Sequence, residues 1–259
     1  MYFDSHTHLN EKRLFADIER VLLNAKTNGV TTMMVPSYDI PSLHNAIILG
    51  EKYHNIYIAL GIHPSDAKRY PISVINDVKK LAKGNAKVKA IGEIGLDYYW
   101  DKTEKERAYQ KEMFIRQIEL ANALQLPVIV HMRDASEDTL EILRKHTPKY
   151  GFLMHCYSGS LEMLEDILAL GGYISFGGPV TFSNAHSPKE NAKAVPINRL
   201  LIETDAPYLT PHPLRGQLNE PQYVVLVNKE IARLREMSEK DLAKITFNNA
   251  ARFFHVETN

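Results

Sequence analysis

Cysteine is almost absent from this chain of 259 residues, whose one thiol belongs to Cys156. A single cysteine excludes an intramolecular disulfide and is typical of proteins from reducing compartments, so we expect a cytoplasmic protein. Cys156 follows the apolar run 152–154 and His155. Strand alternation should turn its thiol away from the histidine. This geometry argues against Cys156 as a catalytic nucleophile.

Net charge and long apolar segments are missing as well. Thirty-one Lys and Arg residues balance 31 Asp and Glu residues, which excludes a global basic surface of the kind that drives non-specific nucleic-acid binding. A local basic patch stays compatible with this balance. No apolar run approaches the ~20 residues that cross a bilayer, and no signal-peptide pattern opens the chain. We therefore expect no membrane partner. The composition sets no oligomeric state and allows a monomer.

The sequence does contain a regular alternation of short apolar runs and amphipathic stretches. The strand-like runs are the first residues, 31–35, 56–60, 90–93, 128–131, 152–155, 173–176 and 201–205. Helix-like stretches are 15–28, 42–53, 73–83, 103–124, 136–145, 161–170, 189–194 and 222–237, followed by a terminal helix that begins with the capping box 238–241. Glycines at 29, 84 and 171 stand where helices should end.

Strands that alternate with helices predict parallel βα units. An open doubly wound sheet and a closed barrel both accommodate them, but eight units in about 250 residues favour the barrel. We therefore predict an α/β protein with a (β/α)8 TIM-type barrel, formed by a single domain over residues 1–259 with an extra C-terminal helix.

Residues that bind metal ions end five of the apolar runs. His6 and His8 follow the first run, and residues two apart in a strand project to the same side. The other four runs end in Glu93, His131, His155 and Asp205. Imidazoles together with carboxylates suit Zn, Mn, Fe, Co or Ni better than Ca or Mg alone. In a barrel these strand ends converge on one axis, so one compact metal site is expected.

The motifs around these residues resemble those of the TatD family, metal-dependent hydrolases of the amidohydrolase superfamily. The resemblance covers nearly the whole chain in order, through Asp4-Ser5-His6-Thr7-His8, Gly61-Ile62-His63-Pro64, Gly92-Glu93-Ile94-Gly95-Leu96-Asp97, His131-Met132-Arg133, His155-Cys156-Tyr157-Ser158-Gly159 and Glu203-Thr204-Asp205-Ala206-Pro207.

This resemblance implies a two-metal site at the C-terminal mouth of the barrel. His6, His8 and Asp205 would hold the first ion, His131 and His155 the second, and Glu93 would bridge both. Family members are described mainly as Mg²⁺- or Mn²⁺-supported deoxyribonucleases, and some are assigned to hydrolysis of aminoacyl esters on tRNA.

Elementary chemistry points the same way. Two neighbouring divalent ions need a shared carboxylate to offset their repulsion, and Glu93 has the reach to supply it. Asp205 can ligate an ion and also accept the proton of the attacking water. We therefore expect two divalent ions per chain (Mg²⁺, Mn²⁺ or Zn²⁺), Glu93 and Asp205 as catalytic residues, and DNA or another phosphodiester as the substrate. Hydrolysis of carboxylic esters, amides or lactones is the alternative, and a catalytically silent metal-binding protein is a third interpretation.

Residues beside the ligands each have two interpretations. His63 could contact a substrate phosphate or make a structural hydrogen bond. Arg133, two residues beyond a ligand, could clamp a phosphate or anchor an acidic side chain. Glu203 should orient a ligand histidine, whereas Asp4 and Ser5 should be structural.

Two further segments bear on the substrate. Tyr98, Tyr99 and Trp100 could stack on bases or simply pack under a loop. Residues 215–221 read Arg-Gly-Gln-Leu-Asn-Glu-Pro, where the family commonly has Arg-Gly-Lys-Arg-Asn-Glu-Pro. The loss of two positive charges argues against tight DNA binding without affecting the metal ligands.

Overall fold

The computed structural model describes residues 1–257, and within them eight parallel strands form one sheet in the order β1 to β8. The strands are β1 (Tyr2–Asp4), β2 (Val30–Pro36), β3 (Ile56–Leu60), β4 (Val88–Asp97), β5 (Val128–Arg133), β6 (Phe152–Met154), β7 (Tyr173–Phe176) and β8 (Leu200–Ile202). The first and last strands meet where Ser5 N donates to Ile202 O at 3.1 Å and Asp205 N donates to His6 O at 2.9 Å. The predicted (β/α)8 barrel is confirmed.

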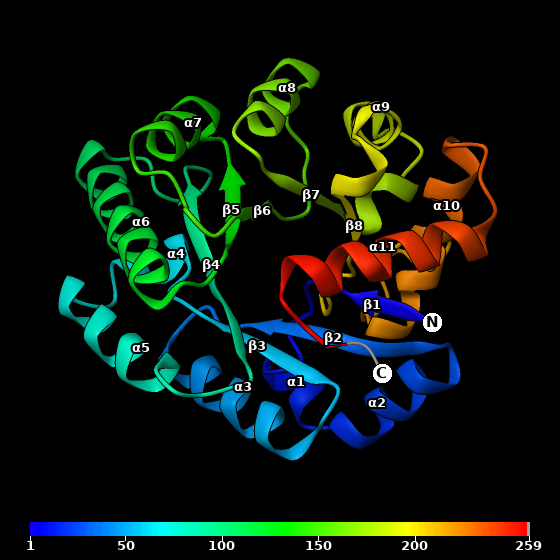
Figure 1. Cartoon of the computed structure of the whole chain (residues 1–259), viewed down its shortest axis with the longest axis horizontal. Helices are drawn as coiled ribbons and strands as arrows, with labels where there is room; N and C mark the ends of the chain where they lie inside the picture. Colours follow the sequence, from blue (N-terminus) through cyan, green and yellow to red (C-terminus); the bar gives the residue numbers. More distant parts are fainter. Residues whose placement is uncertain (258–259) are drawn as a thin grey trace.

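Helices surround this sheet on its outer side (Figure 1). They are α1 (Lys12–Phe15), α2 (Ile18–Thr27), α3 (Ile40–Lys52), α4 (Pro64–Ala67), α5 (Ile75–Ala82), α6 (Glu104–Leu124), α7 (Ser136–Lys145), α8 (Leu161–Ala169), α9 (His186–Ala194), α10 (Val224–Leu234) and α11 (Glu239–Phe253). Short 3-10 turns are η1 (Ile72–Val74), η2 (Gly178–Thr181), η3 (Ile197–Arg199) and η4 (Pro221–Tyr223). The helix predicted over 15–28 is shorter in the structure: α1 ends at Phe15 and α2 begins at Ile18, because Asp17 leaves the helical conformation with φ −128° and ψ 36°.

Local sequence signals set several of these borders. Thr103 begins α6 with a capping box that it forms with Glu106, so two free backbone N–H groups of the first turn gain partners. Gly29, Gly84 and Gly171 follow α2, α5 and α8 with φ of 78°, 80° and 84°. Glycine adopts this left-handed conformation without a steric penalty, so these helices end where the sequence predicted.

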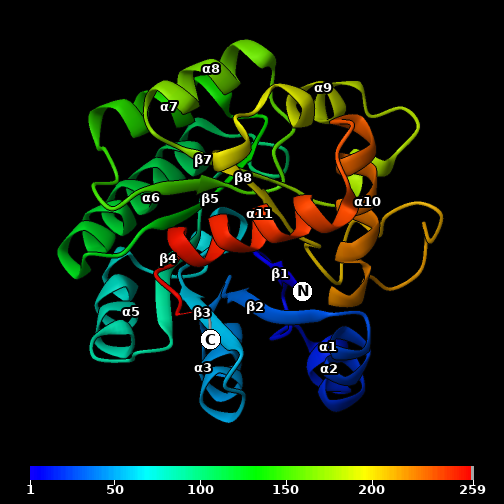
Figure 2. The same cartoon turned by 45° about the vertical axis from the view of Figure 1, so that its right-hand side comes forward.

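The barrel interior is apolar, and α11 closes one end of it. Side chains that point inward, such as Phe3, Met34 and Ile129, form one cluster with Phe253 and Phe254 at the end of α11. Phe253 also packs on Tyr173, the first residue of β7, with ring centroids 4.8 Å apart. The extra C-terminal helix therefore covers the end where the strands begin, as the two views of the ribbon also show (Figure 2). The opposite end, where the strands finish, is left for a site.

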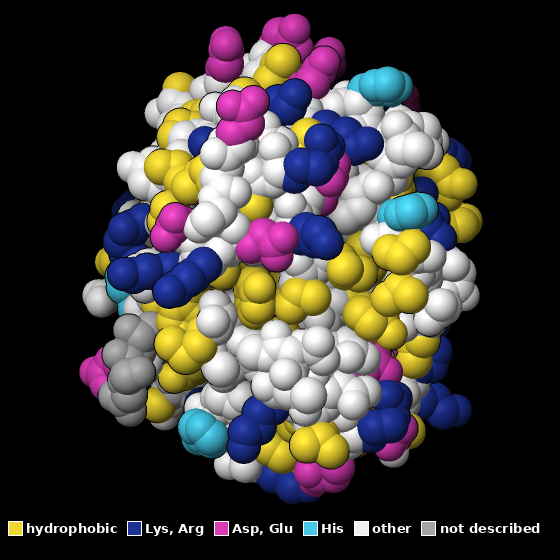
Figure 3. Space-filling view, turned by 90° about the vertical axis from the view of Figure 1, so that its right-hand side faces the viewer, with side chains coloured by type: hydrophobic (Ala, Val, Ile, Leu, Met, Phe, Trp, Pro, Cys, Tyr) yellow, Lys and Arg dark blue, Asp and Glu magenta, His cyan; other side chains and the backbone are white. Residues whose placement is uncertain are grey.

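The outer surface carries charges of both signs. On the side of the barrel shown in Figure 3, Lys and Arg side chains alternate with Asp and Glu side chains and with hydrophobic ones. None of the helices within the described residues is both long enough and apolar enough to cross a membrane.

Candidate metal centre

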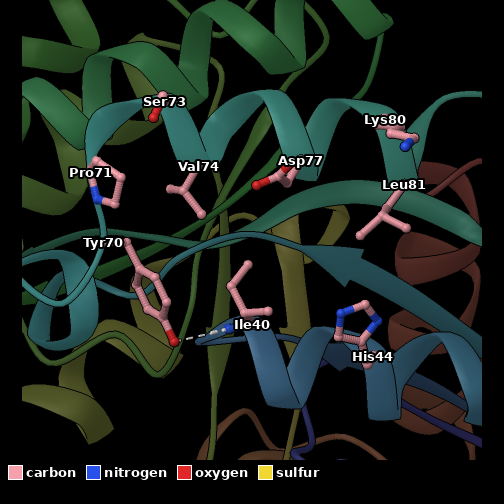
Figure 4. Close-up of a pocket in the computed structure, with 9 residues that line it drawn as sticks. All are labelled: Ile40, His44, Tyr70, Pro71, Ser73, Val74, Asp77, Lys80 and Leu81. Carbon is pink, nitrogen blue, oxygen red and sulfur yellow. Dashed lines mark hydrogen bonds between the residues drawn. The ribbon is translucent and has the colours of Figure 1, made fainter.

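The C-terminal ends of the strands surround a pocket of 670 Å³. Its lining includes five of the six predicted metal ligands, namely His8, Glu93, His131, His155 and Asp205, and the sixth, His6, is fully buried directly below. A second pocket, of 420 Å³, lies between α3 and α5 on the outside of the barrel and contains none of these ligands (Figure 4). The predicted metal ligands therefore gather at the mouth of the barrel.

The first ligand group joins residues from the two ends of the sheet. The Nε2 atoms of His6 and His8 lie 3.2 Å apart. They lie 3.3 and 3.4 Å from Glu93 Oε2. Asp205 Oδ1 lies 3.7 Å from His6 Nε2 and 3.4 Å from His8 Nε2. Atoms bonded at ~2.1 Å to a tetrahedral ion lie about 3.4 Å from one another, so these spacings fit a divalent metal ion.

The second ligand group shares Glu93 with the first but uses its other oxygen. Glu93 Oε1 lies 2.9 Å from His131 Nδ1 and 2.8 Å from His155 Nε2. The two imidazole nitrogens lie 3.3 Å apart. Glu93 is only 2% exposed, so one buried carboxylate faces two separate pairs of imidazoles. This is the arrangement that a carboxylate bridging two ions requires.

Buried carboxylates orient both histidines of the second group. Asp97 Oδ2 lies 3.1 Å from His131 Nε2, and Glu203 Oε1 lies 3.3 Å from His155 Nδ1. Ser175 Oγ donates a hydrogen bond to the other oxygen of Glu203. Each carboxylate accepts the ring N–H that faces it, so the nitrogen beside Glu93 is the one that can bind an ion once it is deprotonated. The structure thus places Glu203 where the sequence predicted an orienting residue.

No carboxylate of this kind orients the histidines of the first group within the described residues. His8 Nδ1 lies 3.3 Å from the carbonyl oxygen of Pro36, which can only accept, so Nδ1 keeps its proton and Nε2 is the nitrogen that can bind an ion once it is deprotonated. The Nδ1 atom of His6 is buried and has no hydrogen-bond partner among residues 1–257. The His6 ring instead stacks on that of His155, with centroids 4.0 Å apart and planes 10° apart.

The carboxylates at the centre of this cluster are anions. Burial opposes the ionisation of Glu93, but the surrounding imidazoles, led by that of His155, outweigh it and hold the pKa of Glu93 well below its usual range. Burial is likewise outweighed at Asp205, whose pKa is lowered chiefly by the hydrogen bond with His8. Burial also opposes the protonation of His8, yet hydrogen bonds with Asp205 and Glu93 raise the pKa of His8 to about 10. Carboxylates and imidazoles that face one another in this way form a donor set suited to divalent metal ions.

His63 is held with a fixed proton position. The backbone N–H of Ser65 donates to His63 Nδ1 at 3.1 Å, where His63 caps the start of α4. Because Nδ1 accepts, the proton of a neutral ring must lie on Nε2, which is 3.4 Å from Glu93 Oε1. Burial and the neighbouring His131 lower the pKa of His63, so the ring is neutral. His63 thus presents an N–H donor to the mouth rather than a lone pair for a metal.

Arg133 lies at the rim in an exposed position. Its guanidinium carbon is 3.7 Å from the centroid of the Tyr99 ring, and both Arg133 and Trp100 line the mouth pocket. The expectation that Arg133 anchors an acidic side chain finds no such contact among the described residues, whose ion pairs do not include it. Tyr98, in contrast, is buried and donates to Asp138 Oδ2 at 2.6 Å, so this aromatic residue packs under the loop.

Cys156 does not follow the expected alternation. Its φ is 44°, in the left-handed region, and both Cys156 and His155 line the mouth pocket. The strand alternation on which the expectation for its thiol rested does not extend to Cys156, because β6 ends at Met154. Burial raises the pKa of the Cys156 thiol well above its usual value, which keeps it protonated and a poor nucleophile.

The residue before the first ligand pair is structural, as expected. Asp4 is fully buried and accepts hydrogen bonds from the backbone N–H of Thr204 at 2.9 Å and from its hydroxyl at 2.6 Å. Ser5 Oγ donates to Ile202 O at 2.9 Å. These contacts fix the segment that carries His6 against the segment that carries Asp205.

Comparison with known proteins identifies the family to which these features belong. The family model described as TatD related DNase matches residues 3–255 of the chain. The chain belongs to the TatD family. It is similar to the uncharacterized metal-dependent hydrolase YabD of Bacillus subtilis, with 46% identity over 257 residues that cover 99% of this chain and 100% of that protein.

Other TatD relatives agree. The uncharacterized metal-dependent hydrolase YcfH of Escherichia coli is 40% identical over 261 residues, covering 99% of this chain and 96% of that one. The crystal structure of YJJV, a TatD homologue from Escherichia coli, matches with a TM-score of 0.93 at 30% identity over 99% of this chain and 98% of that chain. This TatD chain is therefore a metal-dependent hydrolase.

Sequence reasoning assigned no role to Asp97, Tyr38 and Tyr208, which also line the pocket. Asp97 had a detectable signal, since it ends the β4 run four residues after Glu93, and an even spacing in a strand places both on one side. Tyr38 and Tyr208 line the pocket from loops after β2 and β8. Single tyrosines in loops give no pattern from which their position could be predicted.

Proposed function

We propose that this chain is a deoxyribonuclease that hydrolyses phosphodiester bonds with two divalent ions, Mg²⁺, Mn²⁺ or Zn²⁺. The observation that carries the proposal is the position of the Glu93 carboxylate between two pairs of histidines. Its Oε2 faces His6 and His8, and its Oε1 faces His131 and His155. Two ions shared by one carboxylate are typical of enzymes that displace phosphate esters. The description of the matching family as a DNase supports the same substrate class.

The chain's own residues have separate parts in this reaction. When bound, the ions would lower the pKa of the attacking water and offset negative charge on the phosphoryl group. Asp205 is held as an anion by His8, so its carboxylate is available to accept the proton of that water. His63 Nε2–H and the guanidinium of Arg133 are donors suited to the free oxygens of the phosphate.

The depth of the pocket limits which DNA substrates can reach the ligands. His6, His8, Glu93, His155 and Asp205 are all 9% exposed or less, so a reacting phosphate must descend to the floor of the pocket. A volume of 670 Å³ is the size of a pocket for a drug-sized molecule, which corresponds to one or two nucleotides and not to a duplex. We therefore propose that the enzyme trims strand ends or acts on single strands.

One observation favours a second candidate, hydrolysis of carboxylic esters, amides or lactones, including aminoacyl esters on tRNA. The rim segment 215–221 offers one cation, Arg215, and its guanidinium lies 3.9 Å from the centroid of the Phe182 ring and donates to Thr210 O at 3.3 Å. Arg215 is thus engaged within the protein and is poorly placed to bind a nucleic-acid backbone. The same ions would polarise a carbonyl group as readily as a phosphoryl group.

A panel of substrates tests the two candidates. Protein reconstituted with Mg²⁺, Mn²⁺ or Zn²⁺ should be offered single- and double-stranded DNA, a bis-aryl phosphodiester, an aminoacyl-tRNA and simple lactones under the same conditions. Cleavage of DNA with single strands preferred would support the proposal. Turnover of a carboxylic ester or lactone with no cleavage of DNA would refute it in favour of the second candidate.

The number of ions is tested separately. Elemental analysis of the protein reconstituted with Mn²⁺ should approach two ions per chain, and Glu93→Gln should lower this number. A saturating value of one ion that the substitution leaves unchanged would exclude the bridging role of Glu93.

A further inference from the structure

A short aromatic turn between β4 and α6 stands at the rim of the mouth. Its first aromatic residue, Tyr98, is buried, but Tyr99 is 42% exposed and Trp100 is 64% exposed. Trp100 also lines the pocket that contains the metal ligands. Burying an indole stabilises a protein, and an indole left exposed to water does not contribute this free energy. An exposed tryptophan beside a pocket therefore suggests that a bound ligand covers it.

The exposure of Trp100 is not a result of a loose loop, because the turn is fixed at both ends. At its start, Tyr99 N donates to Asp97 Oδ1 at 3.0 Å. At its end, the carboxylate of Asp101 is 1% exposed and accepts hydrogen bonds from Lys68 Nζ at 2.6 Å and Gln110 Nε2 at 2.8 Å. These hydrogen bonds hold the backbone on both sides of Trp100 beside the pocket.

The neighbours of Trp100 add two flat groups. The rings of Tyr99 and Trp100 meet edge to face, with centroids 4.7 Å apart and planes 89° apart. The guanidinium of Arg133 lies over the Tyr99 ring, 3.7 Å from its centroid. Asp97 connects this group to the metal centre, since its second oxygen lies 3.1 Å from the ligand His131. Trp100, Tyr99 and Arg133 are thus fixed next to the second ligand group.

We infer that these three residues form a subsite for a nucleobase of the strand being cleaved, with Trp100 as its stacking surface. An exposed indole beside a stacked guanidinium offers flat surfaces and a cation, which suit a base and the phosphate attached to it. The inference rests on the proposed function and deepens it, because stacking requires an unpaired base. It explains why a single strand would be preferred while base identity would matter little, since every base has a flat face.

Fluorescence gives a direct test, because Trp100 is the one tryptophan in the sequence. The Asp205→Asn variant in Mg²⁺ should be titrated with an eight-residue oligothymidylate, and we expect the indole emission to be quenched as bases stack on it. An eight-residue abasic strand of equal charge should leave the emission unchanged. Equal quenching by both strands, or quenching by neither, would overturn the subsite.

Kinetics gives the second test. Trp100→Ala should raise KM for single-stranded DNA by about 5- to 150-fold, the effect of losing one stacked base, and Trp100→Phe should restore most of the loss. On a strand with three abasic nucleosides at each end, wild type and Trp100→Ala should have the same KM. Tyr150→Ala is the matched control, since Tyr150 is 40% exposed but precedes β6 at the opposite end of the barrel. A normal KM for Trp100→Ala on DNA would overturn the inference.

The two tests separate this inference from the proposed function. If wild type cleaves no DNA with any of the three ions, the proposed nuclease activity is refuted, and the fluorescence titration alone then decides the subsite. If DNA is cleaved but Trp100→Ala and the abasic ends change nothing, the nuclease activity stands and the subsite is refuted.

Discussion

Asp97→Asn should weaken ion binding at the second proposed metal site and leave the first unchanged. Asp97 uses both oxygens, Oδ1 for the backbone N–H of Tyr99 and Oδ2 for His131 Nε2. Asparagine has one oxygen and one amide group. If its oxygen keeps the bond to Tyr99, its NH₂ faces His131, whose ring proton must then move to Nδ1. That proton would occupy the lone pair that faces Glu93, so His131 could no longer bind an ion.

The size of the effect follows from the role of such orienting carboxylates. Loss of one typically lowers metal affinity 10- to 100-fold, or about 1.4 to 2.7 kcal/mol. The loss should affect only the second ion, because the first group is built from His6, His8, Asp205 and the opposite oxygen of Glu93. One site should therefore weaken while the other keeps its affinity.

Calorimetric titration of chelator-treated protein with Zn²⁺ or Mn²⁺ measures both sites. Asp101→Asn is the matched control, since Asp101 lies on the same turn but bonds to Lys68 and Gln110, neither of them a predicted ligand. We expect wild-type binding for this control. Equal weakening of both sites in Asp97→Asn, or no weakening at all, would show that Asp97 does not set the proton position of His131.

Three further outcomes are expected. Asp205→Asn should lower hydrolysis by about 10²- to 10⁴-fold at matched metal content with little change in Tm, because asparagine cannot take a proton; turnover close to wild type would remove Asp205 from proton transfer. His63→Ala and Arg133→Ala should slow cleavage of a DNA end more than that of a neutral ester, whereas equal losses would point to structural roles. Metal binding should release protons and weaken as pH falls, because hydrogen bonds raise the pKa of His8 to about 10 and the ion must displace that proton; titration in buffers of different ionisation enthalpy counts the protons, and affinity independent of pH would contradict this expectation.

The fold was predictable because its signals are local and repeated. Each strand is a short, largely apolar run that alternates with an amphipathic helix, and Gly29, Gly84 and Gly171 mark the helix ends they were expected to mark. The predicted ligands could be found for a related reason, since a ligand at the end of a parallel strand must face the mouth of a barrel.

Contacts between distant loops were not predictable in this way. The exposed position of Trp100 depends on Asp101, Lys68 and Gln110, which come from separate elements and share no spacing. The conformation of Cys156 was missed for a different reason: strand alternation was applied two residues beyond the end of β6, where the backbone is left-handed. Sequence patterns thus identified the candidate ligands but not the arrangement of the rim around them.

The position of the first ligand group has a consequence for stability. His6 and His8 follow the first strand and Asp205 follows the last, so this group spans the place where the two ends of the sheet meet. An ion bound there would link residues 6 and 205 much as a crosslink closes a ring, and the chelated protein would lose that link. Resistance to unfolding should then rise with the concentration of free metal ion, by RT ln(1 + [M]/Kd). The availability of the metal would govern how long the enzyme persists as well as how fast it works.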